Sequence, residues 1–260
     1  MSTYIKTEQN GKFAEVVLSR PKAFNSFHLE MITELAQELT RLAVDDSVRG
    51  VLITGEGKAF CAGGDLRWVT EFAEKPGASF HTLAAQFHNA IVEIRRMEKP
   101  VVAAVNGVAA GGGFSLALAC DLRVMGKSAV LKQAYTSSGL CIDGGGTYTL
   151  PRLVGMARAL EIAVFDEPIS AEKALEWGLA TKVVEDEAVL QEARAMMGVL
   201  SKKSMHSIGL SKNLLNDAFN NTLEYHLELE RQGLGACGDH PDGREGLSAF
   251  AEKRKPEFGK

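Results

Sequence analysis

Two short apolar segments, each running into a glycine-rich turn, constrain the fold of this chain more than any other feature. Residues 50–54 read Gly-Val-Leu-Ile-Thr and precede a turn at 58–66, and residues 101–105 read Val-Val-Ala-Ala-Val and precede a turn at 106–116. Strands this short, without polar alternation, are typical of parallel sheets buried on both faces. A helical pattern lies between them and stops before Pro100. We therefore predict an α/β fold whose mostly parallel sheet is covered by helices.

The second half of the chain is predicted to be mainly helical. Ser170 is a candidate N-cap for a helix that ends near Gly178, and Val183–Val184 is a candidate last strand. From about residue 204 the pattern contains helices only, which we expect over 204–215, 221–234 and 244–253. Such a tail cannot close a core alone, so we expect it to pack on its own domain or on a neighbouring subunit.

Composition excludes several classes of function. Among 260 residues, 29 are Lys or Arg and 33 are Asp or Glu, a net charge of −4 that favours neither nucleic acid nor an anionic membrane as partner. The four cysteines are widely spaced, which predicts neither a zinc site nor a disulfide framework and favours the reducing cytoplasm. The N-terminus has no signal-peptide core. The longest apolar stretch, around 101–119, is interrupted by Asn106 and is a poor membrane span.

The two glycine-rich turns each lead into a predicted helix start, where unpaired N–H groups face outward. Two such amides converging on one oxygen would form an oxyanion hole. Close backbone packing is the other interpretation of the same glycines, and the pattern alone leaves both open. A nucleotide site is disfavoured, since Glu56 stands where a P-loop requires Lys and residues 111–116 lack the last glycine of a dinucleotide fingerprint. No GxSxG elbow is present.

Six segments together resemble the enoyl-CoA hydratase/isomerase (crotonase) superfamily, in the family's order and over essentially the whole chain. They are LSRPKAFNSF (18–27), GKAFCAGGDL (57–66), EKPVVAAVNGVAAGGGFSLALACDLRV (98–124), GGGTYTLPRLVG (144–155), ISAEKALEWGLATKVV (169–184) and REGLSAFAEKRKPEF (244–258).

The resemblance implies an α/β spiral of ββα turns followed by a helical C-terminal region that mediates trimerisation. We accordingly divide the chain into a spiral core of residues 1–200, which holds the ligand site, and a helical region of residues 201–260. It further implies a homo-oligomer, either a trimer or a dimer of trimers. The implied ligand is a small-molecule acyl-CoA, with CoA as part of the substrate and no metal or separate cofactor.

The family's site residues are carried over onto matching positions. The resemblance assigns the oxyanion-hole amides to Gly64 and Gly112. Phe250 and Lys253 would lie near the mouth of the CoA site, supplied by an adjacent subunit. The pantetheine and adenine sides of CoA would lie near Lys22, Ala23, Phe24, Ala62, Asp65 and Leu66.

The carboxylates distinguish among the family's reactions. Hydratases of the family use two glutamates, and their positions are occupied here by Ser115 and Tyr135. Neither side chain is acidic enough to replace a carboxylate at neutral pH, so hydration is disfavoured. We place both residues at the acyl pocket, with Ser115 beside the hole and Tyr135 in its wall.

Asp143 is the remaining candidate acid in this part of the chain. On local sequence alone, a structural role as a turn residue or as a helix N-cap before three glycines is as well supported as a catalytic role. Ring-1,2-epoxyphenylacetyl-CoA isomerases and some Δ3,Δ2-enoyl-CoA isomerases of the superfamily carry a catalytic aspartate here. The resemblance therefore favours double-bond isomerisation, with Asp143 as the base.

Enoyl-CoA hydration, although disfavoured, is kept as one alternative, and two others stay open. Aryl-CoA dehalogenases of the superfamily use an aspartate at this position as a nucleophile and pair it with a helix histidine, which His88 matches. Their chemistry, or a thioesterase-like hydrolysis, would use Asp143 and His88 together. A helix histidine is nevertheless more often structural than catalytic. An alternative of another class is a CoA-binding oligomer without catalytic activity, in which Asp143 only caps a helix.

Overall fold

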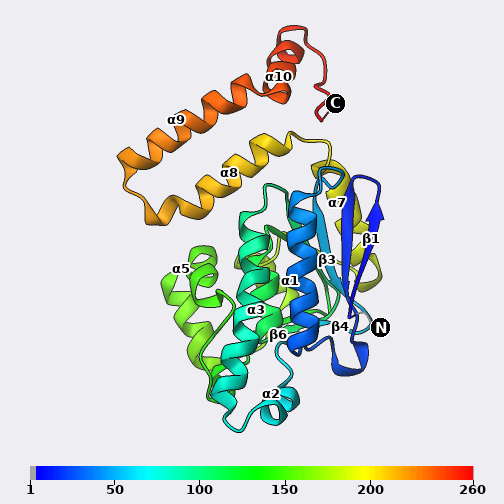
Figure 1. The fold of residues 1–260 in the computed structure, drawn as a ribbon, viewed down its shortest axis with the longest axis vertical. Coiled ribbons are helices and arrows are strands. Elements are labelled where there is room, and N and C mark those ends of the chain that lie inside the picture. Colours follow the sequence, from blue (N-terminus) through cyan, green and yellow to red (C-terminus); the bar gives the residue numbers. More distant parts are fainter. Residues whose placement is uncertain (1–3, 260) are drawn as a thin grey trace.

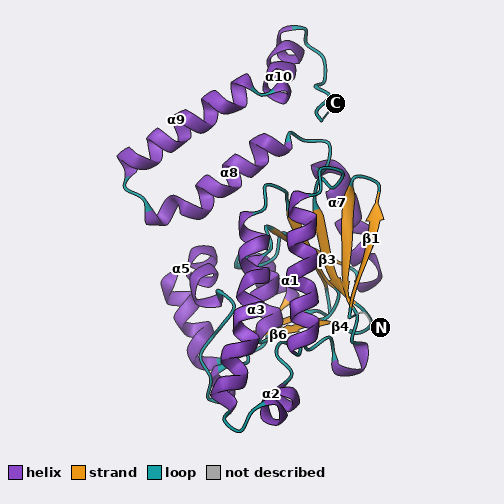
Figure 2. Ribbon diagram, viewed as in Figure 1, coloured by secondary structure: helices purple, strands orange, loops and turns teal. Residues whose placement is uncertain are grey.

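The structure, a computed structural model, describes residues 4–259 and contains two sheets among them (Figures 1 and 2). The larger sheet has the strand order β1-β2-β3-β5-β7-β10 and is parallel except for the β1–β2 pair. The smaller has the order β4-β6-β8-β9 and is parallel except for β8–β9. The strands are β1 Ile5–Asn10, β2 Phe13–Leu18, β3 Val51–Gly55, β4 Ala59–Cys61, β5 Val101–Val105, β6 Val108–Ala110, β7 Leu122–Gly126, β8 Val130–Lys132, β9 Ile169–Ser170 and β10 Lys182–Val184.

Helices cover both faces of the larger sheet, as the unbroken apolar strands predict. Side chains of β3 alternate between the two faces: Val51 and Ile53 join one core cluster, and Leu52 joins the other. The first cluster packs under α1 and α3, which lie side by side in Figure 1, and the second packs under α7. The helices are α1 Leu29–Val44, α2 Leu66–Phe72, α3 Pro76–Arg96, α4 Gly112–Ala119, α5 Gly146–Phe165, α6 Ala171–Glu176, α7 Val189–Leu200, α8 Met205–Asp217, α9 Leu223–Asp239 and α10 Pro241–Ala251.

From β3 to β8, consecutive strands alternate between the sheets, which produces a spiral. β3 lies in the larger sheet and β4 in the smaller, and the pairs β5/β6 and β7/β8 repeat this arrangement. The chain then returns through a helix after β4 and after β6. The predicted ββα spiral is confirmed, and it brings the turn after β4 beside the turn after β6.

The C-terminal helices α8, α9 and α10 lie at one end of the molecule (Figure 1). Ser204 caps α8 and Thr222 caps α9, close to the starts predicted from sequence. The prediction for α10 began three residues late, because His240 supplies the N-cap and Pro241 occupies the first helical position. No helix among residues 4–259 combines the length and apolarity needed to cross a membrane.

Two other predictions concern α6 and the strands. Ser170 caps α6 by accepting a hydrogen bond from the Lys173 amide, and Gly178 follows the helix with a φ of 75°, as expected. Neither β1 nor the second sheet was predicted from the sequence. Most β1 side chains are exposed or only partly buried at a sheet edge, so this strand lacks the apolar periodicity that identifies strands.

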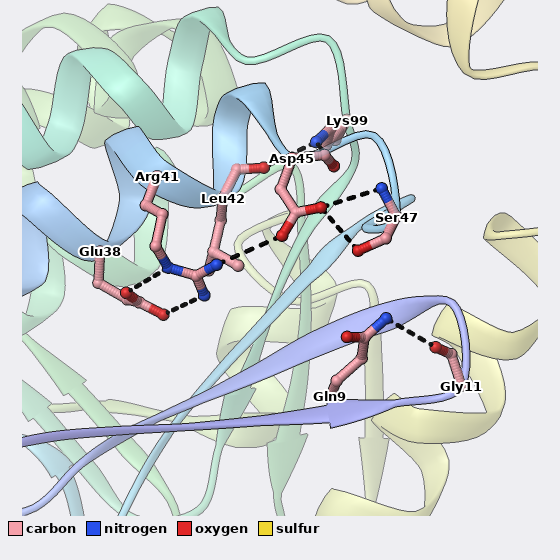
Figure 3. Close-up of polar contacts among 8 residues, drawn as sticks. All are labelled: Gln9, Gly11, Glu38, Arg41, Leu42, Asp45, Ser47 and Lys99. Carbon is pink, nitrogen blue, oxygen red and sulfur yellow. Dashed lines mark hydrogen bonds and ion pairs between the residues drawn. The ribbon is translucent and has the colours of Figure 1, made fainter.

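Side chains satisfy the backbone at both ends of α1. At the start, His28 Nδ1 accepts a hydrogen bond from the Met31 amide at 3.2 Å. At the end, Lys99 Nζ donates to the carbonyl oxygens of Leu42 and Asp45, both at 2.7 Å (Figure 3). Burial lowers the pKa of Lys99, and these carbonyl contacts compensate for part of that desolvation. The N-cap His28 directly follows Phe27, so it also fixes the segment that enters the site described below.

The His28 cap predicts a pH-dependent stability. Burial and then the nearby Arg20 charge lower the pKa of His28 below 6.5 in the folded protein. The unfolded chain therefore binds this proton at a higher pH, and the contribution of His28 to stability is lost as pH falls below about 6.5. Protonation also removes the acceptor from Nδ1.

We expect His28→Asn, which keeps a capping oxygen but does not titrate, to remove about 1 kcal/mol or less of the acid-induced loss of unfolding free energy. Urea denaturation at pH 7.5 and pH 5.5 measures this. Identical pH dependence in the two proteins would contradict it.

Candidate active site

The first glycine turn leaves the Gly64 amide directed away from its neighbouring chain segment. The Phe27 amide donates to the Gly63 carbonyl oxygen at 2.8 Å, and the Asp65 amide donates to the Phe27 carbonyl oxygen at 2.9 Å. Successive amides of an extended segment point in opposite directions, so the Gly64 amide, between these two bonds, faces the other side. Gly64 lines a cavity on that side.

The second glycine turn places a helix start against the first turn. Gly112 is the first residue of α4, so its amide has no acceptor within the helix. A Cβ on Gly63, which has a φ of 88°, would lie 2.7 Å from the Gly112 nitrogen. A Cβ on Gly112 would lie 2.5 Å from Cζ of Phe27. Glycine is therefore required at both positions, and Gly112 lines the same cavity as Gly64.

Two asparagines that were not predicted as site residues bind the turn between β3 and β4, which precedes Gly64 in the chain. The side-chain nitrogen of buried Asn25 donates to the carbonyl oxygens of Glu56 and Ala59 at 3.0 and 2.8 Å. The side-chain nitrogen of Asn106 donates to the carbonyl oxygens of Gly55 and Gly57 at 2.9 and 3.0 Å. Both residues stand inside motifs quoted for the family resemblance, which was the available signal.

The cavity that receives both amides has a volume of about 550 Å³ and mostly apolar walls. Asp143 is the only carboxylate among the described residues that line it. The polar contribution otherwise comes from His81, Tyr135, Ser138, Cys141 and the glycine backbones. The apolar lining consists of Phe27, Ala62, Leu66, Phe80, Leu83, Ala84, Phe87, Ala134 and Leu140.

Asp143 and His88 are in direct contact. His88 Nε2, on α3, lies 2.6 Å from Asp143 Oδ1, on the loop before α5. The side chains are 52% and 36% exposed, respectively, so solvent reaches the pair. Because Oδ1 is engaged by the imidazole, Oδ2 is the oxygen left to act on a ligand. The structure thus brings together the aspartate and histidine that the family resemblance paired.

Ser115 occupies a different place from the one expected of a pocket residue. It is 0% exposed, and its Oγ donates to the Asp143 carbonyl oxygen at 2.6 Å instead of facing the cavity.

Tyr135 lies in the cavity wall, as predicted. Burial raises the pKa of its hydroxyl, so this group is a protonated donor at neutral pH. Buried Asp166 fixes the Tyr135 loop by accepting the amides of Ala134 and Ser137 at 2.7 and 3.3 Å, a role that sequence reasoning missed.

The predicted CoA-side residues separate into two groups. Ala62 and Leu66 line the cavity, whereas Lys22 and Phe24 lie exposed on the turn before α1, with Ala23 between them. Asp65 accepts the amides of Arg67 and Trp68 as the N-cap of α2 and forms an ion pair with Arg20 at 2.6 Å.

Phe250 and Lys253 do not approach this cavity within one chain. Phe250 is 85% exposed on α10, at the opposite end of the molecule from α2 in Figure 1, and Lys253 lies just beyond α10. Among residues 4–259, no group of three or more His, Cys, Asp or Glu side chains is arranged to hold a metal ion.

Sequence comparison shows the family to which this chain belongs. A profile described as enoyl-CoA hydratase/isomerase matches residues 8–260. The chain belongs to the enoyl-CoA hydratase/isomerase family. It is therefore an acyl-CoA-processing enzyme with the family's crotonase fold.

Individual relatives within the enoyl-CoA hydratase/isomerase family carry different activities in their names. A 1,2-epoxyphenylacetyl-CoA isomerase of Escherichia coli (strain K12) is 40% identical over 244 residues, covering 94% of this chain and 93% of that protein. A crotonyl-CoA hydratase of Syntrophomonas wolfei is 34% identical and covers 96% of both chains. A 4-chlorobenzoyl coenzyme A dehalogenase of Arthrobacter is 34% identical, covering 96% and 91%.

Solved structures of the family agree with the fold. The crystal structure of an enoyl-CoA hydratase from Polaromonas sp. JS666 aligns with a TM-score of 0.93 at 37% identity, covering 97% of this chain and 98% of that one.

Proposed function

We propose that this enzyme isomerises an unsaturated acyl-CoA, moving a double bond from the 3 to the 2 position, with Asp143 as the single base. The observation that carries the proposal is that Asp143 is the only carboxylate among the described residues lining the cavity that Gly64 and Gly112 also line. Hydration requires one group to activate water and a proton source for C2. A double-bond shift requires only one group that removes and returns a proton.

The chemistry follows from the positions of these groups. The thioester carbonyl oxygen accepts hydrogen bonds from the Gly64 and Gly112 amides. Asp143 Oδ2 removes a proton from C2, and the electrons of that C–H bond form a dienolate whose negative charge rests on the carbonyl oxygen. The protonated carboxyl then donates the same proton to C4, the double bond forms between C2 and C3, and Asp143 returns to its ionised state.

The similarity to a 1,2-epoxyphenylacetyl-CoA isomerase supports the isomerase class and suggests a second substrate type. Three phenylalanines and Tyr135 contribute rings to the cavity lining, a surface suited to a cyclic acyl group. Linear 3-enoyl-CoA and ring-epoxide acyl-CoA substrates should therefore be assayed in parallel.

Replacing Asp143 tests the proposal. We expect Asp143→Asn, which keeps the shape but removes the base, to lower kcat for 3-enoyl-CoA isomerisation by about 10²–10⁴-fold. Asp46→Asn, at an exposed carboxylate outside the cavity, makes the same change of charge and serves as control. Spectrophotometric detection of the conjugated 2-enoyl product measures both. Turnover by Asp143→Asn at the rate of the control would overturn the assignment.

A second candidate function is supported by the contact between His88 and Asp143. In this reaction Asp143 attacks the ring carbon of a haloaryl-CoA and halide leaves, forming an aryl ester. Water deprotonated by His88 then hydrolyses that ester at the carboxyl carbon. Similarity to a 4-chlorobenzoyl coenzyme A dehalogenase also supports this candidate.

The two functions differ in covalent chemistry. Because we favour Asp143 as a base, we expect 4-chlorobenzoyl-CoA to release no chloride and to leave no adduct on the protein. Intact-mass measurement after rapid quenching, together with a chloride assay, tests this. An aryl adduct located on the peptide that contains Asp143 would establish the nucleophilic role instead.

We propose that the active form is a trimer or a dimer of trimers. Helix α9 has no buried residue within the single chain. Large apolar side chains on the C-terminal helices are exposed, a pattern typical of a surface covered by another subunit. They are Leu215, Leu223, Tyr225, Leu227, Leu234, Leu247 and Phe250.

Light scattering coupled to gel filtration is expected to give three or six times the chain mass of 28.0 kDa. A monomer at micromolar concentration would contradict an assembly through the C-terminal helices.

A further inference from the structure

Ser115 connects α4, whose first residue is Gly112, to the segment that carries Asp143. Gly112 and Ser115 are the first and fourth residues of α4, so they lie one helical turn apart. Ser115 Oγ donates to the Asp143 carbonyl oxygen at 2.6 Å, and the Gly146 amide donates to that same oxygen at 3.1 Å. Both lone pairs of the carbonyl are thereby used. A single short helix thus supplies an amide of the hole and a fixed contact to the residue that bears the carboxylate.

The chain after Asp143 rests directly on Ser115. A Cβ on Gly144, which has a φ of 60°, would lie 3.0 Å from Ser115 Cβ, and a Cβ on Gly146 would lie 2.8 Å from Ser115 Oγ. Gly144 is also held against Phe87, whose Cε1 would be 2.2 Å from such a Cβ. The glycines after Asp143 therefore have a packing role, which is to let this segment approach α4 closely enough for the serine bond.

The Tyr135 hydroxyl is also hydrogen-bonded to the Ser115 side chain and to the Asp143 backbone, so these three residues form one hydrogen-bonded group. The serine bond is better suited to hold Asp143 than the contact between its carboxylate and His88. The His88–Asp143 pair is partly exposed, so water competes for both groups. Ser115 is fully buried, so water does not replace its hydroxyl if the hydroxyl is removed. Outside this contact, the segment between Gly139 and Gly145 belongs to no helix or strand.

We infer that Ser115 is a positioning residue, which sets the Asp143 carboxylate relative to the Gly112 amide through the Asp143 backbone. The inference rests on the proposed function, because it assigns Ser115 no purpose unless Asp143 acts on a ligand held at the hole. Ser115 stands at the position where hydratases of the family have a glutamate, and it would have a different role here. Instead of providing a second acid, the residue aligns the one that is present. Misplacement of a reacting group by about 1 Å can lower a rate by about 10²-fold.

The test is a double-mutant cycle between Ser115 and Asp143. We expect Ser115→Ala to lower kcat for the isomerisation by about 10- to 100-fold while KM changes by less than about threefold. In an Asp143→Asn background the same substitution is expected to have no further effect, because its action passes through the carboxylate. Thr33→Ala, which removes a hydroxyl-to-carbonyl bond of 2.7 Å inside α1, controls for loss of a hydrogen bond away from the cavity.

A spectroscopic measurement distinguishes a displaced Asp143 carboxylate from a disturbance of the Gly64 and Gly112 amides. The enolate absorption of bound acetoacetyl-CoA reports on the two amides and should be the same in Ser115→Ala as in the unaltered protein. Ser115→Cys keeps a similar volume and a weak donor, so its kcat should lie between those of Ser115→Ala and the unaltered protein. It replaces Ser115→Ala in the test if that variant does not fold.

The outcomes distinguish the inference from the function on which it rests. Wild-type kcat in Ser115→Ala, or an equal further loss in the Asp143→Asn background, overturns the positioning role while leaving Asp143 as base. Loss of the enolate absorption in Ser115→Ala assigns the serine to the integrity of α4 and also overturns it. Full activity of Asp143→Asn alone overturns the proposed function.

Discussion

Direct backbone contact between the two glycine turns is the constraint on which the site depends. The contact exists because β4 and β6 are adjacent parallel strands, so the turns that follow them meet at one edge of the smaller sheet. A Cβ on Gly63 would strike the Gly112 nitrogen, and one on Gly113 would lie 1.9 Å from the Cys61 carbonyl oxygen. Only glycine allows the approach, and the approach in turn fixes how the Gly64 and Gly112 amides face the cavity.

Much of the scaffold could be predicted because it depends on local patterns. Buried strands such as Val101–Val105 and caps such as Ser170 are encoded within a few residues, and both lie where the sequence predicts. The strand β1 and the smaller sheet escaped prediction because their strands are short or polar. The start of α10 was misplaced because His240 was not recognised as a cap.

The site was less accessible to local reasoning. Pattern alone left Asp143 undecided between cap and base, and the family resemblance directed attention to it. The contacts that hold the site join residues far apart in the chain: His88 and Asp143 are separated by 55 positions, and Ser115 and Asp143 by 28. Hydrogen bonds of this range, like those of Asn25 and Asp166, leave no periodic signal in a sequence. They become visible only when the fold brings the segments together.

In the proposed mechanism, the groups that hold the thioester carbonyl and the carboxylate that reacts belong to different parts of the molecule. The carbonyl would be held by the backbone amides of Gly64 and Gly112, in turns where glycine is required. The Asp143 carboxylate instead lies on an irregular segment that contacts a serine hydroxyl and a histidine. On this proposal, substitutions in that segment and along the facing side of α3 change the reaction while the glycine amides still hold the thioester. If the proposal holds, overall similarity within this family indicates the acyl-CoA ligand more reliably than the reaction. This explains how relatives named hydratase, isomerase and dehalogenase all resemble this chain to a comparable degree.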